Sequence, residues 1–335
     1  MTYTPIKEFK VGDKLTQVFM LSDVEGRTTK KGKAYGRLTV RDKKAQITTN
    51  VWDFDPREYP EIKPGVFVSM TIEVDQFKGE KNAVCREVPM PVAAPEDLSA
   101  YHDDRGLSPA AVDSCWDQLM AFKDSVGNVF IKAFLDVIFG NPETERLFKH
   151  APASASNRGA YKGGLVEHVL KVMRNADFLL QSQATANNPA PINRDVVIAG
   201  VLCHDLGKMY SYSVDHTGAS TTASGRLIGH LVQSYGIAVQ SFIQTESVIR
   251  QAIPEAIKDH INHCILSHHG RLEWGSPVTP ISIEAQLVHQ ADVADCSISN
   301  FAEPVVDRID EKNDDGFVPG DGRFNSRFIY VDDSK

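Results

Sequence analysis

The stretch Leu202-Cys-His-Asp-Leu-Gly-Lys208 places adjacent histidine and aspartate side chains at the end of a helix expected over residues 194–204. Adjacent helix positions cannot chelate one ion as an i, i+4 pair can, but the two side chains can lean together where the helix ends. Lys208 lies three positions after Asp205 on the same face, so its ammonium can hold a phosphate oxygen beside a metal site. Gly207 leaves room for a substrate to approach the backbone closely. We therefore expect catalytic roles for Asp205 and Lys208.

Further histidines and an aspartate lie on both sides of this stretch, each on or next to an expected helix. The helices are expected over residues 165–180, 194–204, 227–245, 254–267 and 282–297. One ligand group on each helix or helix pair is what a helical bundle needs to direct side chains at a common centre. The expected metal ligands are His168, His204, Asp205, His230, His268, His269 and Asp292.

This set of candidate ligands is large enough for two metal ions. The first ion is expected to be held by His168, His204, Asp205 and Asp292. Asp205 would also bridge to a second ion, which His230 and His268 complete. His269 is either a further ligand or a supporting residue, and His289 is expected to support a ligand without binding the metal.

The types of ligand indicate the metal and the chemistry. Imidazole and carboxylate ligands without cysteine favour Mn²⁺ as the bound ion. Fe²⁺, Co²⁺, Ni²⁺ and Zn²⁺ are alternatives. Two such ions about 3.5–4 Å apart bind a hydroxide, polarise a phosphoryl group and neutralise the leaving oxygen. No Walker loop or GxGxxG motif is present, so nucleotide triphosphate energy is not implied. The pattern predicts a metal-dependent hydrolase.

Residues 1–90 differ in pattern from the rest, with short alternating or apolar runs separated by glycine-containing turns. About five strands in this length favour a small closed barrel of the OB type, with an SH3-like barrel or a small sandwich as alternatives. Residues 91–110 contain several prolines and are expected to form a linker. Residues 111–335 are expected to form an all-α bundle with a C-terminal extension, in which Arg327–Tyr330 docks back on the fold. The expected fold class is therefore multidomain α and β, with an N-terminal OB-like β-barrel followed by a helical domain.

Charge is distributed unevenly along the chain, whose net charge is −8. Residues 1–90 hold 16 Lys and Arg against 13 Asp and Glu, whereas the remainder holds 20 against 31. Residues 27–44 contain eight basic residues and a single acidic one, Asp42. A local basic patch of this kind attracts a polyanion at short range, whatever the charge of the whole chain.

Strand alternation places aromatic and basic side chains on one outer face of the expected barrel. The side chains expected to point inward are Leu38, Val40, Ile47 and Val51. Bases stack on exposed aromatic rings while cations meet phosphates, so the outer face suits single-stranded nucleic acid. The alternative is a protein-docking or dimerisation face with Trp52 under a loop. The residues assigned to nucleic acid are Arg27, Lys30, Lys31, Lys33, Tyr35, Arg37, Arg41 and Trp52.

Several sequence features bear on the compartment. No apolar run approaches the roughly 18 residues that cross a membrane. The first residues lack a cationic region followed by an apolar one, so no secretory signal is expected. The 5 cysteines lie far apart without a CxxC pair, which argues against a disulfide framework. We expect a cytoplasmic protein without a membrane partner.

Two motifs in the helical part, Leu202–Lys208 and Gly163–His168, resemble the signature of HD-domain phosphohydrolases. An OB-like barrel followed by such a domain resembles the YhaM family of bacterial 3′→5′ exoribonucleases across nearly the whole chain. In the barrel the matching segments are Glu25–Tyr35 and Val51–Asp53. In the helical domain they are Gly163–His168, His204–Lys208, Gly225–His230, Ser267–Pro277 and Gln290–Asp295.

The resemblance implies a divalent-metal-dependent enzyme of the Mn²⁺ type. It would remove nucleoside 5′-monophosphates from the 3′ end of single-stranded RNA, with single-stranded DNA as a further substrate. Histidines that precede the first Gly-Gly in the family are replaced here by Asn157-Arg158-Gly159. Contacts with the substrate end are therefore assigned, as a hypothesis, to Arg158, Tyr161 and Lys162. A homo-oligomer is left open.

Two other functions stand as alternatives. One is a phosphodiesterase or phosphohydrolase acting on a small nucleotide, such as a cyclic one, because His268-His269-Gly270 and Gly275-Ser276-Pro277 are similar to a motif of cyclic-dinucleotide phosphodiesterases. The tyrosine of that motif is absent, and an enzyme that acts on a small diffusible substrate would not need a basic barrel. The other is a non-catalytic RNA-binding protein, against which the complete set of candidate ligands argues.

Overall fold

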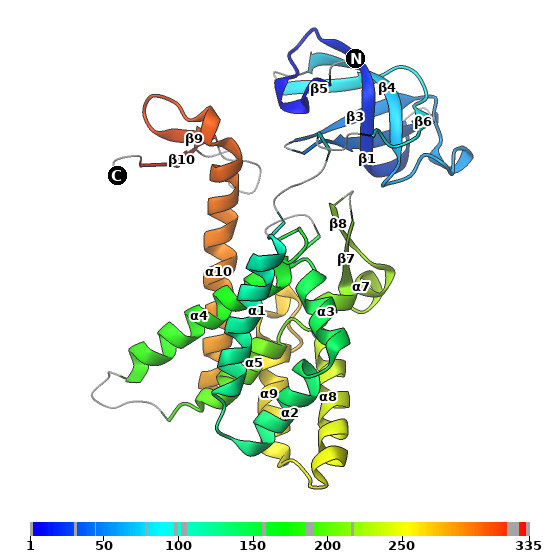
Figure 1. Ribbon diagram of the computed structural model, residues 1–335. Coiled ribbons are helices and arrows are strands. Elements are labelled where there is room, and N and C mark those ends of the chain that lie inside the picture. Colours follow the sequence, from blue (N-terminus) through cyan, green and yellow to red (C-terminus); the bar gives the residue numbers. More distant parts are fainter. Residues whose placement is uncertain are drawn as a thin grey trace. The chain divides into compact units, whose positions relative to one another are not determined.

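The computed structural model describes residues 3–29, 32–43, 45–77, 80–96, 100–101, 106–155, 159–184, 191–215, 218–319 and 328–332. The chain forms two compact units (Figure 1). The first comprises Met1–Arg105 with His216–Gly218, and the second comprises Gly106–Asp215 with Ala219–Lys335. Residues 91–105, which lie in the stretch expected as a linker, therefore cluster with the first unit.

The first unit is a closed five-stranded β-barrel, as the sequence predicts. Its strands are β1 (Lys14–Thr28), β2 (Ala34–Arg41), β3 (Gln46–Trp52), β4 (Phe67–Phe77) and β5 (Glu80–Cys85). Antiparallel pairing joins β1 to β2 and β4, β2 to β3, and β4 to β5. The parallel pairing of β3 with β5 closes the ring, and a short strand β6 (Met90–Val92) adds to β4.

The barrel core follows the strand alternation. Leu38, Val40 and Val51 are fully buried, as predicted for one face of β2 and β3, and Ile47 packs against them. Gly36 lies on the same inner face, where the ring of Phe54 covers it. A Cβ at Gly36 would lie 2.3 Å from Cδ1 of Phe54, so only glycine leaves room for this fully buried ring.

The second unit is mainly helical. Its longer helices are α1 (Pro109–Asp124), α2 (Val129–Phe139), α3 (Pro142–His150), α4 (Gly164–Ala184), α5 (Arg194–Cys203), α8 (His230–Ile249), α9 (Glu255–Ser267) and α10 (Ile283–Arg308). The short helices are α6 (Lys208–Ser211), α7 (Ala223–Leu227) and the 3-10 turns η3 (Leu272–Trp274) and η4 (Ile309–Glu311). The helix expected over 227–245 is wrong in its beginning, because Gly229 has a φ of +79° and separates α7 from α8.

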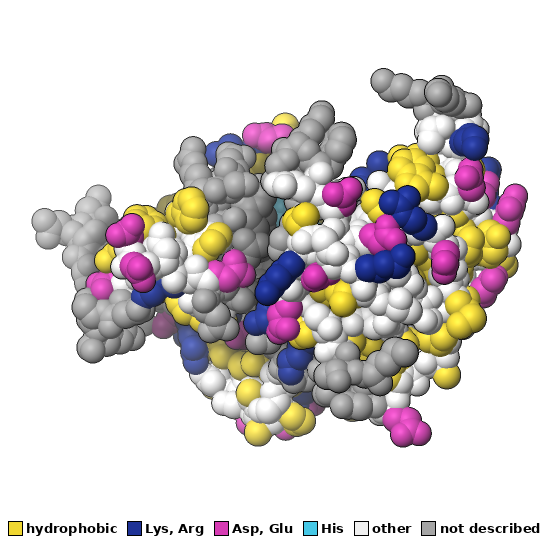
Figure 2. Space-filling model, turned by 90° about the horizontal axis from the view of Figure 1, so that it is seen from above, with side chains coloured by type: hydrophobic (Ala, Val, Ile, Leu, Met, Phe, Trp, Pro, Cys, Tyr) yellow, Lys and Arg dark blue, Asp and Glu magenta, His cyan; other side chains and the backbone are white. Residues whose placement is uncertain are grey.

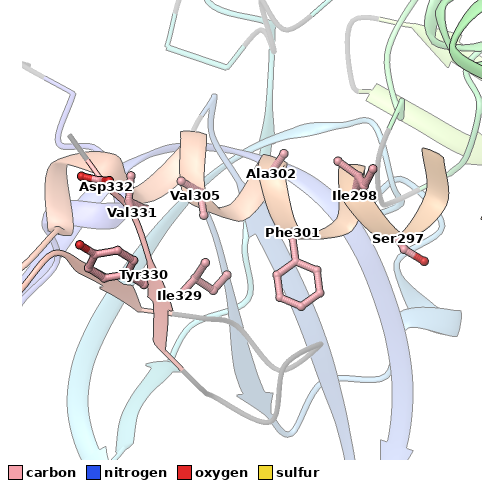
Figure 3. Close-up of a pocket in the computed structure, with 9 residues that line it drawn as sticks. All are labelled: Ser297, Ile298, Phe301, Ala302, Val305, Ile329, Tyr330, Val331 and Asp332. Carbon is pink, nitrogen blue, oxygen red and sulfur yellow. The ribbon is translucent and has the colours of Figure 1, made fainter. Parts of the chain in front are cut away.

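Two short hairpins were not expected in this helical unit. One joins β7 (Tyr212–Asp215) to β8 (Gly218–Thr221), and the other joins β9 (Phe317–Pro319) to β10 (Phe328–Tyr330). The β9–β10 hairpin and the last turns of α10 line a pocket of about 550 Å³ (Figure 3). Of the tail expected to dock back on the fold, Phe328–Tyr330 does so as β10, and Arg327 lies outside the described residues.

Helix α5 is the centre of the bundle and contacts α4, α9 and α10. Every residue from 196 to 203 is buried, which explains its nearly continuous apolar sequence. The helix begins at Asn193, whose side chain accepts hydrogen bonds from the amides of Asp195 and Val196. A Cβ at Gly200 would lie 2.9 Å from Cβ of Cys264, so α9 approaches this helix closely. The buried helix thereby delivers the residues that follow it to the centre of the unit.

Within the part of the chain that the structure describes, none of the helices has the length and apolar character needed to cross a membrane.

Candidate metal centre

The structure brings all seven predicted ligands together from five places in the helical unit. His168 lies on α4, His204 and Asp205 follow α5, and His230 begins α8. His268 and His269 follow α9, and Asp292 lies on α10. The side chains of His168, His204, Asp205, His268 and Asp292 are buried. Ends of helices therefore supply five of the seven groups, where side chains can turn toward a common point.

The carboxylate of Asp205 lies between two groups of imidazoles. Its Oδ2 is 3.1 Å from Nε2 of both His168 and His204. Its Oδ1 is 3.5 Å from Nε2 of His230 and 3.8 Å from Nε2 of His268. The two oxygens of one side chain thus face two separate clusters, which is the arrangement of a carboxylate that bridges two cations.

Each cluster has the composition of a cation site. In the first, ligand atoms of His168, His204 and Asp205 lie within 4.8 Å of one another. Asp292 joins this cluster, since its Oδ1 is 3.4 Å from Nε2 of His168. The second cluster has ligand atoms of His230, His268 and His269 within 4.8 Å of one another. Nε2 of His269 is 3.2 Å from Nε2 of His230, so His269 faces the second cluster and not the surrounding protein.

Hydrogen bonds at Nδ1 orient four of the imidazoles. Nδ1 of His204 donates to the carbonyl of Val201 at 2.7 Å, and Nδ1 of His268 donates to that of Ile265 at 2.7 Å. Nδ1 of His269 donates to the carbonyl of Trp274 at 2.8 Å. A proton fixed on Nδ1 leaves the Nε2 lone pair for a metal ion.

The fourth imidazole, His168, has a carboxylate partner that was not predicted from the sequence. Nδ1 of His168 lies 2.7 Å from Oδ2 of Asp295, and Oδ1 of Asp295 accepts a hydrogen bond from Ser299 at 3.1 Å. A carboxylate behind a ligating histidine fixes the ring and increases its basicity. The available signal was spacing, because Asp295 lies one helical turn after Asp292 and on the same face.

Two buried atoms test whether cations fit this centre. Nε2 of His204 and Oδ1 of Asp205 are both buried and have no hydrogen-bond partner among the described residues. A buried polar atom without a partner costs about 1–3 kcal/mol. A lone pair on each of these atoms would be satisfied by a divalent cation. The residues present therefore fit a pair of divalent ions.

The charges around Asp205 keep it ionised. Burial works to raise the pKa of the Asp205 carboxyl, but the Lys208 ammonium, 2.6 Å from Oδ2, and the flanking imidazoles hold that pKa well below its usual value. Burial likewise opposes ionisation of Asp292, yet the imidazoles, that of His168 foremost, lower its pKa. Both carboxylates are thus negative at neutral pH.

Two imidazoles of the second cluster, those of His230 and His268, are neutral at neutral pH. Burial lowers the pKa of His230 to about 3 and the pKa of His268 well below its usual value. At His204 burial also works to lower the pKa, but Asp205 raises it above its ordinary value. Neutral rings offer lone pairs directly to a cation.

Comparison with known proteins agrees with this geometry. The model of the HD domain family matches residues 165–296, a range that contains all seven ligands. A relative from Listeria innocua serovar 6a named 3′-5′ exoribonuclease YhaM is 27% identical over 296 residues, covering 87% of this chain and 88% of the relative. One of the same name from Bacillus subtilis is 25% identical and covers 90% of each chain. A third, from Geobacillus sp., is 25% identical and covers 92% of this chain and 88% of its own. The chain is thus similar to these YhaM exoribonucleases over most of its length, and its residues 165–296 match the HD domain.

One residue of the family's HD signature has a role other than the expected one. Gly207 was expected to admit a substrate to the backbone, and this prediction is wrong. A Cβ at Gly207 would lie 2.2 Å from the carbonyl oxygen of His230 and 2.8 Å from Cβ of Gln233. The amide of Gly207 also donates to Oγ of Ser234 at 2.8 Å. Gly207 therefore lets the first turn of α8, which carries His230, pack against the turn that carries Asp205.

His289 supports the second cluster from α10. Its Nδ1 lies 2.7 Å from the carbonyl oxygen of His268, so it contacts the backbone of a ligand and not the metal side of the ring. Gly270 has a φ of +79°, and a Cβ there would lie 2.1 Å from Cε1 of His289. The backbone after the two adjacent histidines therefore packs directly against the His289 ring.

The residues assigned to the substrate end have mixed outcomes. The hydroxyl of Tyr161 donates to the carboxylate of Glu167, and Tyr161 lines a small pocket that also includes His168 and Asp295. Lys162 is exposed. Arg158 lies outside the described residues. Tyr161 is thus the member of this set that the structure places beside a ligand.

On the barrel, strand register brings together three of the residues assigned to nucleic acid. Arg27 of β1 is opposite Tyr35 of β2, which is opposite Trp52 of β3. The rings of Tyr35 and Trp52 have centroids 5.0 Å apart, and Trp52 is 47% exposed. The exposure of Trp52 argues against a position under a loop.

The basic side chains on this face are partly compensated. Arg27 pairs with Glu25 at 2.6 Å, and Lys33 lies 3.5 Å from Asp53. Arg37 and Arg41 are half-buried on β2, and Lys30 and Lys31 lie outside the described residues. In the view of Figure 2, basic and acidic side chains are mixed over the described surface. Any binding of a polyanion here therefore depends on local pairs of arginine and aromatic ring.

Proposed function

We propose that the protein is a divalent-metal-dependent 3′→5′ exoribonuclease that releases nucleoside 5′-monophosphates from single-stranded RNA. The observation that carries the proposal is the Asp205 carboxylate, whose two oxygens face two separate clusters of imidazoles. Relatives named 3′-5′ exoribonuclease YhaM match along both the barrel and the helical unit, which supports RNA as the substrate class.

The residues divide into two ligand sets. One cation would be held by His168, His204, Asp205 and Asp292. The other would be held by Asp205, His230, His268 and His269. When bound, a pair of divalent cations supplies an activated water and neutralises charge on the phosphodiester. We propose Mn²⁺ as the cation because the ligands are imidazoles and carboxylates without a thiolate.

Lys208 completes the charge pattern. Its side chain is buried, and its ammonium lies 2.6 Å from Oδ2 of Asp205. In a site with little water, a fixed positive charge stabilises negative charge that develops on a phosphoryl oxygen. We assign Lys208 to hold a non-bridging phosphate oxygen while it keeps Asp205 ionised.

The barrel would bind nucleotides of the strand that do not take part in the reaction. The pair of Tyr35 and Trp52 offers an aromatic surface for bases, and Arg27 beside it offers a cation for phosphates. Stacking does not depend on the 2′-hydroxyl, so single-stranded DNA is proposed as a further substrate.

The test uses the full chain, Mn²⁺ and two preparations of one single-stranded RNA, labelled at the 5′ or the 3′ end. With the 3′ label we expect immediate release of labelled mononucleotide, and with the 5′ label a ladder that shortens from the 3′ end. Internal cuts or release of the 5′ nucleotide would contradict the proposal. Faster cleavage of a cyclic dinucleotide than of the RNA would favour the small-nucleotide alternative.

A further inference from the structure

The turn after the two adjacent histidines carries an exposed tryptophan beside the metal centre. The carbonyl of Trp274 accepts the hydrogen bond from Nδ1 of His269, so the backbone of this residue is one hydrogen bond away from the second cluster. Its side chain is 49% exposed. Burying an indole is favourable, because apolar surface leaves water and the ring stacks well on other flat groups. A half-exposed indole at this place is available to a ligand of the metal centre.

Backbone hydrogen bonds fix this turn. The amides of Trp274 and Ser276 both donate to the carbonyl of Arg271, at 3.1 and 3.2 Å. The amide of Gly275 donates to the carbonyl of Leu272 at 3.0 Å, and Gly275 has a φ of +89°, which glycine adopts without strain. A fixed turn loses little conformational freedom when a ligand binds, and this favours affinity.

A cation accompanies the ring. Cζ of Arg271 lies 4.5 Å from the centroid of the Trp274 ring, within the range of a cation–π contact. The side chain of Arg271 is 60% exposed, and its nearest ion-pair distance, to Glu273, is 3.8 Å. The guanidinium is thus held over the indole while much of it still faces water.

We propose that Trp274 and Arg271 form the subsite for the last nucleotide of the strand, a role that rests on the proposed exonuclease function. The indole stacks on the base at the 3′ end, and the guanidinium pairs with a phosphate of the same end. Every base has a π-face, so such a subsite accepts any terminal nucleotide. The combination of aromatic ring and arginine is the one that Tyr35, Trp52 and Arg27 form on the barrel.

The backbone and the side chain of Trp274 can be tested separately. The contact with His269 uses the backbone carbonyl of Trp274, which any side chain at this position retains. Replacing the indole therefore removes the stacking surface and leaves the hydrogen bond to the ligand. Leu272 offers a matched control, because it is 62% exposed in the same turn.

The experiment measures binding of two RNA strands to the full chain in chelator, where no hydrolysis occurs. One strand ends in an ordinary 3′ nucleotide, and the other ends in an abasic one. Trp274→Ala is expected to weaken binding of the ordinary strand by roughly tenfold and to leave the abasic strand unchanged. Trp274→Phe should keep most of the affinity, and Leu272→Ala should match the wild type on both strands.

Arg271→Ala is expected to weaken both strands equally and to lower the slope of log Kd against log salt by about 0.7, the value for one phosphate contact on a single strand. Mn²⁺ binding to Trp274→Ala, measured by calorimetry, should equal that of the wild type.

Three results for Trp274→Ala would each overturn the subsite. They are an equal loss of affinity for both RNA strands, no loss of affinity for either strand, and a loss of affinity for Mn²⁺. These outcomes are separate from the fate of the proposed function. A protein that discriminates the two strands in chelator but releases no 3′ nucleotide with Mn²⁺ would keep the subsite and refute the exonuclease.

Discussion

The barrel face and the metal centre use charge and aromatic rings under opposite conditions. On the barrel, Trp52 is 47% exposed and Arg27 pairs with Glu25 at the surface. In the metal centre, His204 and Asp205 are 0% and 1% exposed. Exposed ion pairs keep their hydration and contribute little to stability, whereas a buried charge needs compensation from its neighbours. It follows that a single substitution on the barrel should weaken RNA binding by a modest factor. A single substitution of a buried charge in the metal centre should abolish hydrolysis.

The largest effect is expected for Asp205→Asn. The change keeps the size of the side chain but removes the charge that faces both clusters, so hydrolysis of RNA should fall by more than about a thousandfold, beyond the loss of a single stabilising group. Rates with Mn²⁺ on 3′-labelled RNA measure it, and circular dichroism checks that the variant is folded. A variant that retains a tenth of the wild-type rate would rule out the bridging role.

A second change should separate the two clusters. Gly207→Ala places a methyl group 2.2 Å from the carbonyl oxygen of His230, so the first turn of α8 has to move. Affinity for the second cation should fall by more than the roughly hundredfold typical of a lost supporting group, with the first cation retained. Calorimetry with Mn²⁺ should then show one site per chain.

Gly236 on the same helix gives the control for this change. A Cβ at Gly236 meets nothing within 4 Å, so Gly236→Ala should leave both sites intact and stabilise the fold by about 0.4–1 kcal/mol. Equal Mn²⁺ binding by the two variants would show that α8 does not depend on its close approach to the Asp205 turn.

A smaller effect is expected behind the first cluster. Asp295→Asn leaves the shape of the residue but removes the charge beside Nδ1 of His168, so Mn²⁺ affinity should fall by about 10–100-fold. Asp117→Asn, an exposed change on α1, is the control and should bind Mn²⁺ as the wild type does. An unchanged affinity in Asp295→Asn would mean that the carboxylate does not position the ring.

The smallest of these effects belongs to the barrel. Trp52→Ala removes one stacking surface, so the Kd for single-stranded RNA should rise by roughly tenfold while Mn²⁺ binding stays the same. Met90→Ala, 62% exposed on β6, serves as the control. Fluorescence anisotropy in chelator measures RNA binding by both variants. Equal RNA affinities of Trp52→Ala and Met90→Ala would show that the Trp52 face does not bind the strand.

The two regions also differ in how far the sequence predicts them. On the barrel, alternation within β2 and β3 was enough to place Leu38 and Val51 inward and Trp52 outward, because the period of a strand is local. The seven candidate metal ligands could be named from the sequence motifs. The contacts that hold them could not, since Asp295 and His168 are 127 residues apart and meet only when α10 packs on α4.

Close packing accounts for one of the remaining errors. Gly207 looked like a place for substrate because glycine lets a ligand approach the backbone closely, yet α8 fills that space. The β7–β8 hairpin and the break at Gly229 also escaped prediction. A run of apolar residues indicates a helix more strongly than one glycine indicates its interruption.

The most direct test of the account is a titration of the wild-type protein with Mn²⁺, followed by calorimetry and electron paramagnetic resonance. We predict two ions per chain, with the spectrum of a spin-coupled pair that share one carboxylate. A single ion per chain, or two ions that give the spectrum of isolated Mn²⁺, would contradict it.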